Sequence, residues 1–181
     1  MSAYSDVESL FNSSVGAEYL GEDITLVEHM IQCAELAIAE GSPDWLVVAA
    51  LLHDIGHMLI PDAEEAQNSG VDRHHDEVGA EWIAARFPEN VVEAVRLHVE
   101  AKRYLVTTDP TYVEKLSEAS QITLKLQGSE MTPAEVEAFA TTPFAEEAIQ
   151  LRIWDDLGKV RGASQSSIEK FKPYIDSVAL N

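Results

Sequence analysis

Residues 45–58 read WLVVAALLHDIGHM, and this stretch decides the fold. Its first eight residues are apolar, and the polar pair His53-Asp54 follows them directly. We expect a buried helix that starts at Ser42 and Pro43, as N-cap and first-turn residues, and carries the pair at its C-terminal end. Burying such groups unpaired costs free energy, so the pair needs partners elsewhere in the chain.

Histidines are the partners that the sequence offers. The chain has six, and four of them fit the ligand pattern of a two-metal helical site together with two aspartates. Neutral imidazole suits divalent iron, manganese or zinc, whereas a carboxylate can bridge two cations. A lone His-Asp pair would be read as a surface or capping pair, but three histidines on other predicted helices favour a metal site. The candidate ligands, with Asp54 as the bridge, are His29, His53, Asp54, His75, His98 and Asp155.

Composition narrows the class of protein. A length of 181 residues suits one domain with a substantial core, so residues 1–181 are predicted to form a single domain. The formal net charge of −20 argues against a nucleic-acid partner. Cys33 is the only cysteine and is predicted to be a core residue. No apolar run suggests a membrane span and the N-terminus lacks the pattern of a signal peptide, so we expect a cytoplasmic protein.

The hydrophobic periodicity is helical throughout, which predicts an all-α fold. Residues 24–41 repeat apolar positions at helical spacing and stop at Gly41, and residues 75–87 and 89–105 continue the pattern. Further helix starts are expected at residues 109–110, at 132–135 with a capping box, and at 142–143. The last stretch, 166–180, is expected to be helical with an interruption at its proline. Residues 61–73 are polar and can be a solvated connection or a lid.

The series His29, His53-Asp54 and Asp155 resembles the metal signature of the HD-domain superfamily, helical proteins that are mostly metal-dependent phosphohydrolases. In "HDIGH", however, His57 stands where many of those hydrolases carry Lys or Arg. The chain is more similar to a small oxygenase branch, the mixed-valent diiron enzymes that degrade organophosphonates. That resemblance runs from about Tyr19 to 159 and is most specific in "YLGEDITLVEH", "AALLHDIGH", "HVEAKRYLV", "LSEASQITLKLQG" and "LRIWDDLGK".

The resemblance implies an HD-domain helical bundle with a dinuclear metal site in its core. Two iron ions in the Fe(II)/Fe(III) state would be the cofactors, and O2 the co-substrate. His29, His53, Asp54 and Asp155 would hold one iron, and Asp54, His75 and His98 the other. His57 would lie behind the ligands or near the substrate, or serve as a structural histidine, and His74 is expected to be an exposed neighbour.

Substrate-binding residues are implied at both ends of a phosphonate. Lys102, Ser120 and Arg152 would bind the phosphonate anion, since cationic and hydroxyl donors suit it. Without the resemblance, the two cations would be read as solvated or salt-bridged side chains. At the other end, the family pattern places Tyr19 and Glu22 beside the substrate nitrogen, and the adjacent Asp23 adds a second carboxylate. A trimethylammonium group is held by diffuse charge and aromatic faces, so this composition favours the trimethylated compound.

The implied activity is oxidative cleavage of the carbon–phosphorus bond of 1-hydroxy-2-(trimethylammonio)ethylphosphonate, which yields glycine betaine and phosphate. The same chemistry on 1-hydroxy-2-aminoethylphosphonate would give glycine. Two other classes stay open, a metal-dependent phosphohydrolase and a silent metal-binding module. The sequence leaves the oligomeric state undetermined.

Overall fold

The apolar stretch after Pro43 forms α3 (Asp44–Leu52), in which every residue from Leu46 onward is buried. In this computed structural model, which describes residues 2–13, 22–60 and 74–180, each residue from Leu46 to Leu52 is at most 6% exposed. A helix without a polar face must be covered on all sides. The cap is Pro43, without a side-chain hydrogen bond, so the helix starts one residue later than Ser42 and Pro43 predicted.

Helices surround α3, and no strand occurs in the parts of the chain that the structure describes, which confirms the all-α prediction. The remaining α-helices are α1 (Ala3–Phe11), α2 (Leu26–Ala39), α4 (Gly56–Leu59), α6 (His75–Ala84), α7 (Glu89–Arg96), α8 (His98–Thr108), α9 (Glu118–Leu126), α10 (Pro133–Ala140), α11 (Ala145–Leu157) and α12 (Lys172–Val178). Short 3-10 helices are η2 (Tyr112–Lys115) and η3 (Ile168–Phe171).

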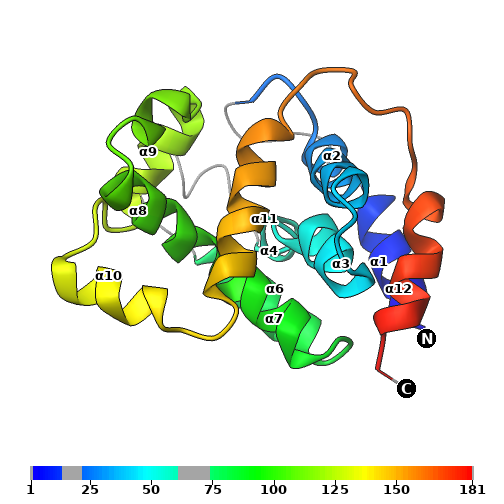
Figure 1. Ribbon diagram of the computed structural model, residues 1–181. Coiled ribbons are helices and arrows are strands. Elements are labelled where there is room, and N and C mark those ends of the chain that lie inside the picture. Colours follow the sequence, from blue (N-terminus) through cyan, green and yellow to red (C-terminus); the bar gives the residue numbers. More distant parts are fainter. Residues whose placement is uncertain (1, 14–21, 61–73, 181) are drawn as a thin grey trace.

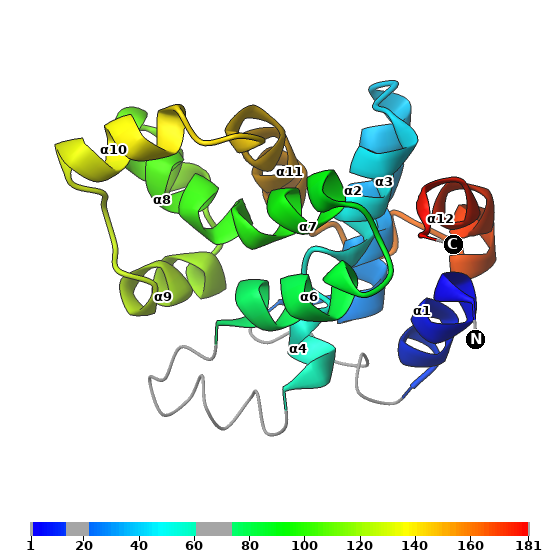
Figure 2. The same cartoon turned by 90° about the horizontal axis from the view of Figure 1, so that it is seen from below.

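α11 runs through the middle of the molecule and separates two groups of helices (Figure 1). On one side α2 and α3 pack against α11, and α1 and α12 close the far margin; on the other side lie α8, α9 and α10. The view from below agrees, with α6 and α7 beneath α11 and α3 (Figure 2). The largest hydrophobic core lies around α3, and two smaller clusters lie around α8. None of the described helices has the length and apolarity needed to cross a bilayer.

Several predicted helix boundaries are confirmed. α2 ends just before Gly41, which has a φ of +72°, and Thr132 with Glu135 forms the predicted capping box of α10. The predicted start at 142–143 is early, since α11 begins at Ala145. The predicted start at 109–110 leads only to η2, and the C-terminal interruption falls one residue before the predicted proline, between η3 and α12. Residues 61–73, predicted to be a connection or a lid, lie outside the described residues.

One boundary that the periodicity missed matters for the site. The pattern over 89–105 predicts one helix, but the chain breaks at Leu97 into α7 and α8. Leu97 ends the first helix and precedes the second, and its side chain is buried in the cluster between α8, α10 and α11. Apolar spacing is similar on both sides of such a break, so the pattern alone does not show it. The break places His98 at the first position of α8.

The crossing of α4 and α6 requires glycine. A Cβ added to Gly56 would lie 1.8 Å from the backbone oxygen of His75, and one added to Gly79 would lie 3.2 Å from the backbone nitrogen of Gly56. Backbone atoms cannot move aside as a flexible side chain can, so α6 sits against α4 only because Gly56 has no side chain. This contact sets the position of His75.

We therefore expect Gly56→Ala to lower the free energy of unfolding by about 3 kcal/mol or more, because α6 must shift away from α4. Gly79→Ala is the matched comparison: its Cβ meets a looser contact and gains helix propensity, so its net change should stay within about 1 kcal/mol. Urea unfolding of both variants measures this. An unfolding midpoint for Gly56→Ala equal to that of the wild type would contradict the close crossing.

Candidate metal centre

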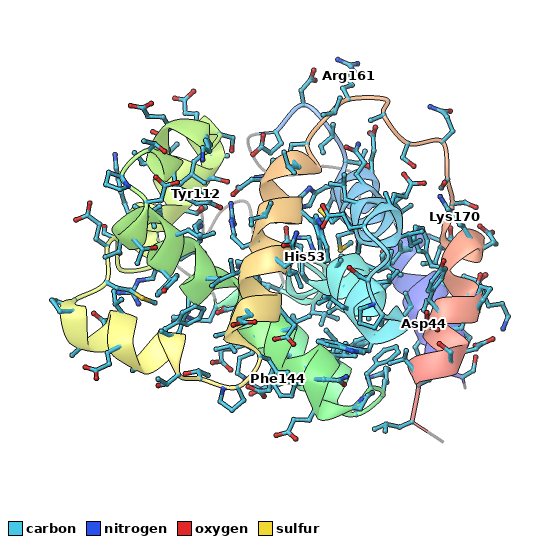
Figure 3. The ribbon with its side chains drawn as sticks, viewed as in Figure 1. Asp44, His53, Tyr112, Phe144, Arg161 and Lys170 are labelled. Atoms are coloured by element: carbon cyan, nitrogen blue, oxygen red, sulfur yellow. The ribbon has the colours of Figure 1, made fainter. Side chains whose placement is uncertain are left out.

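Five separate helices or helix ends bring the six candidate ligands to the middle of the molecule. Figure 3 shows His53 there, between α3 and α11. All six residues are at most 9% exposed, although each carries a polar or charged side chain. The sources are α2 for His29, the C-terminus of α3 for His53 and Asp54, the first residue of α6 for His75, the first residue of α8 for His98, and α11 for Asp155.

Asp54 lies between two pairs of histidines. Its Oδ2 is 3.5 Å from Nε2 of both His29 and His53, and these two nitrogens are 3.1 Å apart. Its Oδ1 is 3.4 Å from Nε2 of His75 and 3.6 Å from Nε2 of His98, which are 3.2 Å apart. Each carboxylate oxygen thus faces its own pair of imidazole nitrogens, as a carboxylate that bridges two cations would.

The opposite ring nitrogens of three of these histidines face backbone carbonyls. A carbonyl only accepts, so each Nδ1 carries the proton, and a neutral ring then offers the lone pair of Nε2 to the centre of the cluster. Such bonds fix the tautomer and the orientation of metal-binding imidazoles. The pairs are His29 with Gly158 at 2.9 Å, His53 with Ala50 at 2.9 Å and His98 with Val95 at 2.6 Å.

Asp155 faces the His29 and His53 side of the cluster. Its Oδ1 is 3.4 Å from His29 Nε2, and its Oδ2 is 4.0 Å from His53 Nε2 and accepts a hydrogen bond from Arg152 at 2.6 Å. Within the described residues, the buried Oδ1 of Asp155 accepts no hydrogen bond. Buried polar atoms normally have a partner, and a cation is one that would suit an oxygen here.

The electrostatics of the cluster favour bound cations. Burial opposes the charge of Asp54, but His53, with hydrogen bonds from His29 and His75, outweighs it and holds the pKa of Asp54 well below its usual range. Burial lowers the pKa of His53, and burial with the charge of His75 lowers that of His98 well below 6.5. Deprotonated carboxylates and neutral imidazoles are the forms that bind metals.

The pKa values of His29 and His75 move the other way. Burial by itself would lower both, but for His29 the neighbouring Cys33 and two aspartates, and for His75 chiefly Asp54, raise them above the usual value. The acidic groups therefore draw positive charge to these rings. A metal cation would take the place of those protons.

Among the described residues, two sets of ligand atoms are close enough together to hold an ion: Asp54 with His75 and His98, and His29 with His53 and Cys33. The thiol is the weaker candidate in the second set. Cys33 Sγ is 3.8 Å from the Nδ1 of His29 and donates to the carbonyl of Trp154, and burial raises its pKa. A protonated thiol that donates elsewhere is a poor ligand, so Asp155 completes that side better. Cys33 is buried in the core, as predicted.

His57 and His74 lie beside the cluster without entering it. The half-buried ring of His57 stacks on that of His75, with centroids 4.0 Å apart, and burial followed by the charge of His75 lowers its pKa to about 3. His57 is therefore neutral, and its ring supports that of His75 by stacking on it. His74 is exposed, as expected, and precedes α6 in the left-handed conformation with φ +52°.

The three predicted phosphonate-binding residues are buried together beside Asp155. Lys102, Ser120 and Arg152 are 3%, 6% and 3% exposed, and the guanidinium of Arg152 lies 3.5 Å from Ser120 Oγ. Lys102 donates to Thr123 Oγ1 at 3.0 Å. Burial, followed by the charge of Arg152, lowers the pKa of Lys102 to about 7. Cationic and hydroxyl donors concentrated in the interior next to candidate metal ligands are the groups that suit an anion.

The residues expected to bind the substrate nitrogen lie in different environments. Glu22 is directed inward, where it accepts hydrogen bonds from Ser117 Oγ at 2.5 Å and pairs with Lys159 at 3.2 Å. Asp23 points outward: its side chain is 82% exposed and pairs at 3.0 Å with Arg161, which Figure 3 shows at the margin of the molecule. The geometry thus supports Glu22 and gives no support to Asp23. Tyr19 lies outside the described residues.

Three further side chains complete the site, and sequence reasoning did not single them out. Asp156 pairs with Arg152 and accepts a hydrogen bond from Tyr112, so it holds the guanidinium beside Asp155. Lys159 contacts Ser120 and Glu22. One signal was present: in "LRIWDDLGK", Asp156 falls one helical turn after Arg152 and shares its face, and Lys159 comes four residues after Asp155, just past the end of α11.

Lys102 provides a prediction on stability. The folded protein holds its pKa near 7, whereas the unfolded chain keeps the proton up to the usual 10.5, so the wild type gains stability as the pH rises from 7 towards 10. Below pH 7 the full penalty of the buried charge applies. We expect Lys102→Met to stabilise the metal-free protein by about 1–3 kcal/mol at pH 6–7, with a difference that shrinks towards pH 10.

Urea unfolding across this pH range measures the Lys102 effect. Lys125→Met is the matched control, because Lys125 is exposed on α9 and its replacement should give a small difference independent of pH. Groups far from Lys102 affect the wild type and the variant alike and cancel in the comparison, whereas His75, whose pKa the charge of Lys102 lowers, contributes to the difference. A Lys102→Met variant less stable than the wild type at pH 6–7 would contradict the account.

An all-α bundle with a buried cluster of histidines and aspartates at its centre is the architecture of a helical metal-binding domain. A model of the HD-domain family matches residues 26–158, a span that contains all six candidate ligands. The chain therefore belongs to the HD-domain family.

Named relatives narrow the comparison. The chain is 40% identical to 1-hydroxy-2-(trimethylamino)ethylphosphonate dioxygenase (glycine-betaine-forming) of Leisingera caerulea over 169 residues. This alignment covers 93% of this chain and 86% of that protein. Over 174 residues it is 38% identical to hydroxymethylphosphonate dioxygenase of Gimesia maris, covering 94% and 87%. It is also 31% identical over 166 residues to an uncharacterized protein of Acanthamoeba polyphaga mimivirus, covering 91% and 76%. Phosphonate dioxygenases are thus among its similar proteins.

Proposed function

We propose that this protein is a cytoplasmic diiron dioxygenase that cleaves the carbon–phosphorus bond of 1-hydroxy-2-(trimethylammonio)ethylphosphonate and releases glycine betaine and phosphate. The observation that carries the proposal is the position of Asp54, whose two oxygens face two separate histidine pairs. The similarity to a glycine-betaine-forming phosphonate dioxygenase over 93% of the chain supports the substrate.

The metal ligands would divide between two iron ions. His29, His53 and Asp155 would hold one, His75 and His98 the other, with Asp54 shared between them. Bound iron supplies the binding and reduction of O2 and the Lewis acidity that draws in substrate oxygens. The overall reaction places the two atoms of O2 in the acid and phosphate products, so it needs no external reductant.

The chain's own residues bind and orient the substrate. Arg152, Lys102 and Ser120 form the anion end of the site and would take the phosphonate; Asp155 is held by the Arg152 guanidinium at 2.6 Å, which ties the anion end to the metal end. Glu22 would take the ammonium at the other end. Fixing both ends holds the C1–P bond beside the metal ions, which is the contribution of orientation to catalysis.

Two related substrates are separate outcomes of the test. The relative from Gimesia maris is named a hydroxymethylphosphonate dioxygenase, so hydroxymethylphosphonate, which has no nitrogen, is a second candidate substrate. The free amine, 1-hydroxy-2-aminoethylphosphonate, differs in its N–H donors, which would lose water without full replacement in a pocket suited to a quaternary ammonium.

Oxygen uptake and phosphate release test the proposed function. The protein is loaded with iron anaerobically, mixed with each of the three hydroxyphosphonates, and exposed to O2. We expect O2 consumption and phosphate release in equal amounts, fastest with the trimethylated compound. Phosphate release from a phosphate ester without O2, and no turnover of the phosphonates, would identify a phosphohydrolase instead.

A further inference from the structure

Lys159 joins the two ends of the site. Its Nζ lies 2.9 Å from Ser120 Oγ at the anion end and 3.2 Å from Glu22 Oε1 at the other end, and 3.6 Å from Oδ1 of Asp155. The side chains of Lys159 and Glu22 are only 10% and 12% exposed. Surface ion pairs contribute little, but removing one partner from a pair this far from water leaves an uncompensated buried charge, which is costly.

The charges of this pair mirror those of the proposed substrate. A trimethylammonio phosphonate carries negative charge at one end and positive charge at the other. Lys159 and Arg152 both contact Ser120 Oγ, so Lys159 belongs to the anion end. Of the acids Glu22 and Asp23, only Glu22 faces inward. In the protein without substrate, the two ends therefore neutralise each other.

We propose that Lys159 is a specificity-determining residue that exchanges Glu22 for the phosphonate when substrate binds, so that the site selects substrates with charge at both ends. This inference rests on the proposed function. A zwitterion replaces one ion pair by two, since its phosphonate pairs with Lys159 and its ammonium with Glu22. A phosphonate without a cationic group breaks the same pair and leaves the Glu22 carboxylate unmatched in a poorly hydrated position, which is unfavourable.

Binding of two unreactive probes tests the exchange. The probes are 2-(trimethylammonio)ethylphosphonate, which has both charges but no hydroxyl group, and methylphosphonate, which has only the anion. Calorimetry is done anaerobically on the full-length, iron-loaded protein. We expect the wild type to bind the zwitterion at least about 10-fold more tightly than methylphosphonate.

Two substitutions should have opposite signatures. Lys159→Met removes the anion contact and should weaken both probes by about 10- to 100-fold, and Lys159→Arg should restore part of the loss. Glu22→Gln should weaken the zwitterion but tighten methylphosphonate by a few fold, roughly, because no carboxylate is then left unmatched. A merely structural role for Glu22 would weaken both probes together.

Lys170→Met is the matched control. Lys170 pairs with Glu35 and Ser166, which repeats the Lys-Glu-Ser combination on the surface, and Figure 3 shows it well away from His53. Its replacement should leave both affinities unchanged.

The inference is overturned by wild-type affinities in Lys159→Met, by weaker methylphosphonate binding in Glu22→Gln, or by equal wild-type binding of the two probes. Should Lys159→Met fail to fold, the Glu22→Gln result decides. Failure of the proposed function looks different: the probes are still discriminated, but no hydroxyphosphonate is turned over. Turnover of the hydroxyphosphonates together with unchanged probe affinities in both variants would refute the proposed exchange but not the dioxygenase activity.

Discussion

Asp54→Ala is expected to remove both metal ions and to abolish activity. Each oxygen of Asp54 faces a separate histidine pair at 3.4–3.6 Å, so one substitution takes a ligand from both halves of the site. It also removes the negative charge that would offset two cations in a buried position. Iron analysis of the purified variant measures the effect, and activity should fall by about three orders of magnitude or more.

The control for Asp54 is His74→Asn. His74 is next to His75 in sequence but exposed, and asparagine tolerates the left-handed conformation at this position. Its iron content should stay near that of the wild type. Full iron occupancy in Asp54→Ala, or an equal loss in His74→Asn, would refute the assignment of the ligands.

Arg152→Ala should cost about 2–4 kcal/mol in transition-state binding, or about 30- to 1,000-fold in kcat/KM, if Arg152 pairs with the phosphonate. Its guanidinium is buried and is held by Asp155 at 2.6 Å and by Asp156. Lysine should rescue only part of the loss, because it lacks the planar fork. Since Asp155 is a candidate ligand, iron content is measured alongside the kinetics.

Arg161→Ala is the matched arginine control. Arg161 also pairs with an aspartate, Asp23, but its side chain is 75% exposed. We expect kcat/KM to stay near that of the wild type, and the same result for Asp23→Ala, since Asp23 points away from the cluster. Wild-type kinetics in Arg152→Ala would place Arg152 outside the site. A lower kcat/KM for the trimethylated compound alone in Asp23→Ala would show that Asp23 belongs to the site.

The core of the fold was predictable because its signal is local. α3 has no polar face, so its burial follows from its own sequence, and the His53-Asp54 pair at its end then requires partners. The helix cap at Thr132 likewise depends only on neighbouring residues. The break at Leu97 was not predictable, because apolar spacing continues across it and the packing around α8 determines where the helix ends.

The site was predictable where residue type limits the chemistry. Buried histidines and aspartates have few roles, so the candidate ligands could be proposed before their distances were known. Glu22 and Asp23 show the opposite case. They are adjacent and chemically alike, yet one pairs with Lys159 inside and the other with Arg161 outside. Only the contacts of distant segments separate them, and no local pattern contains that information.

The central claim is that the metal centre is used for oxidation by O2, and isotope labelling tests it most directly. The iron-loaded protein is given 1-hydroxy-2-(trimethylammonio)ethylphosphonate under ¹⁸O2 in unlabelled water, and the acid product is analysed by mass spectrometry. We predict glycine betaine that carries ¹⁸O in its carboxylate, formed in step with phosphate. Phosphate released under ¹⁸O2 with an acid product that contains only unlabelled oxygen, or released equally well without O2, would contradict the account.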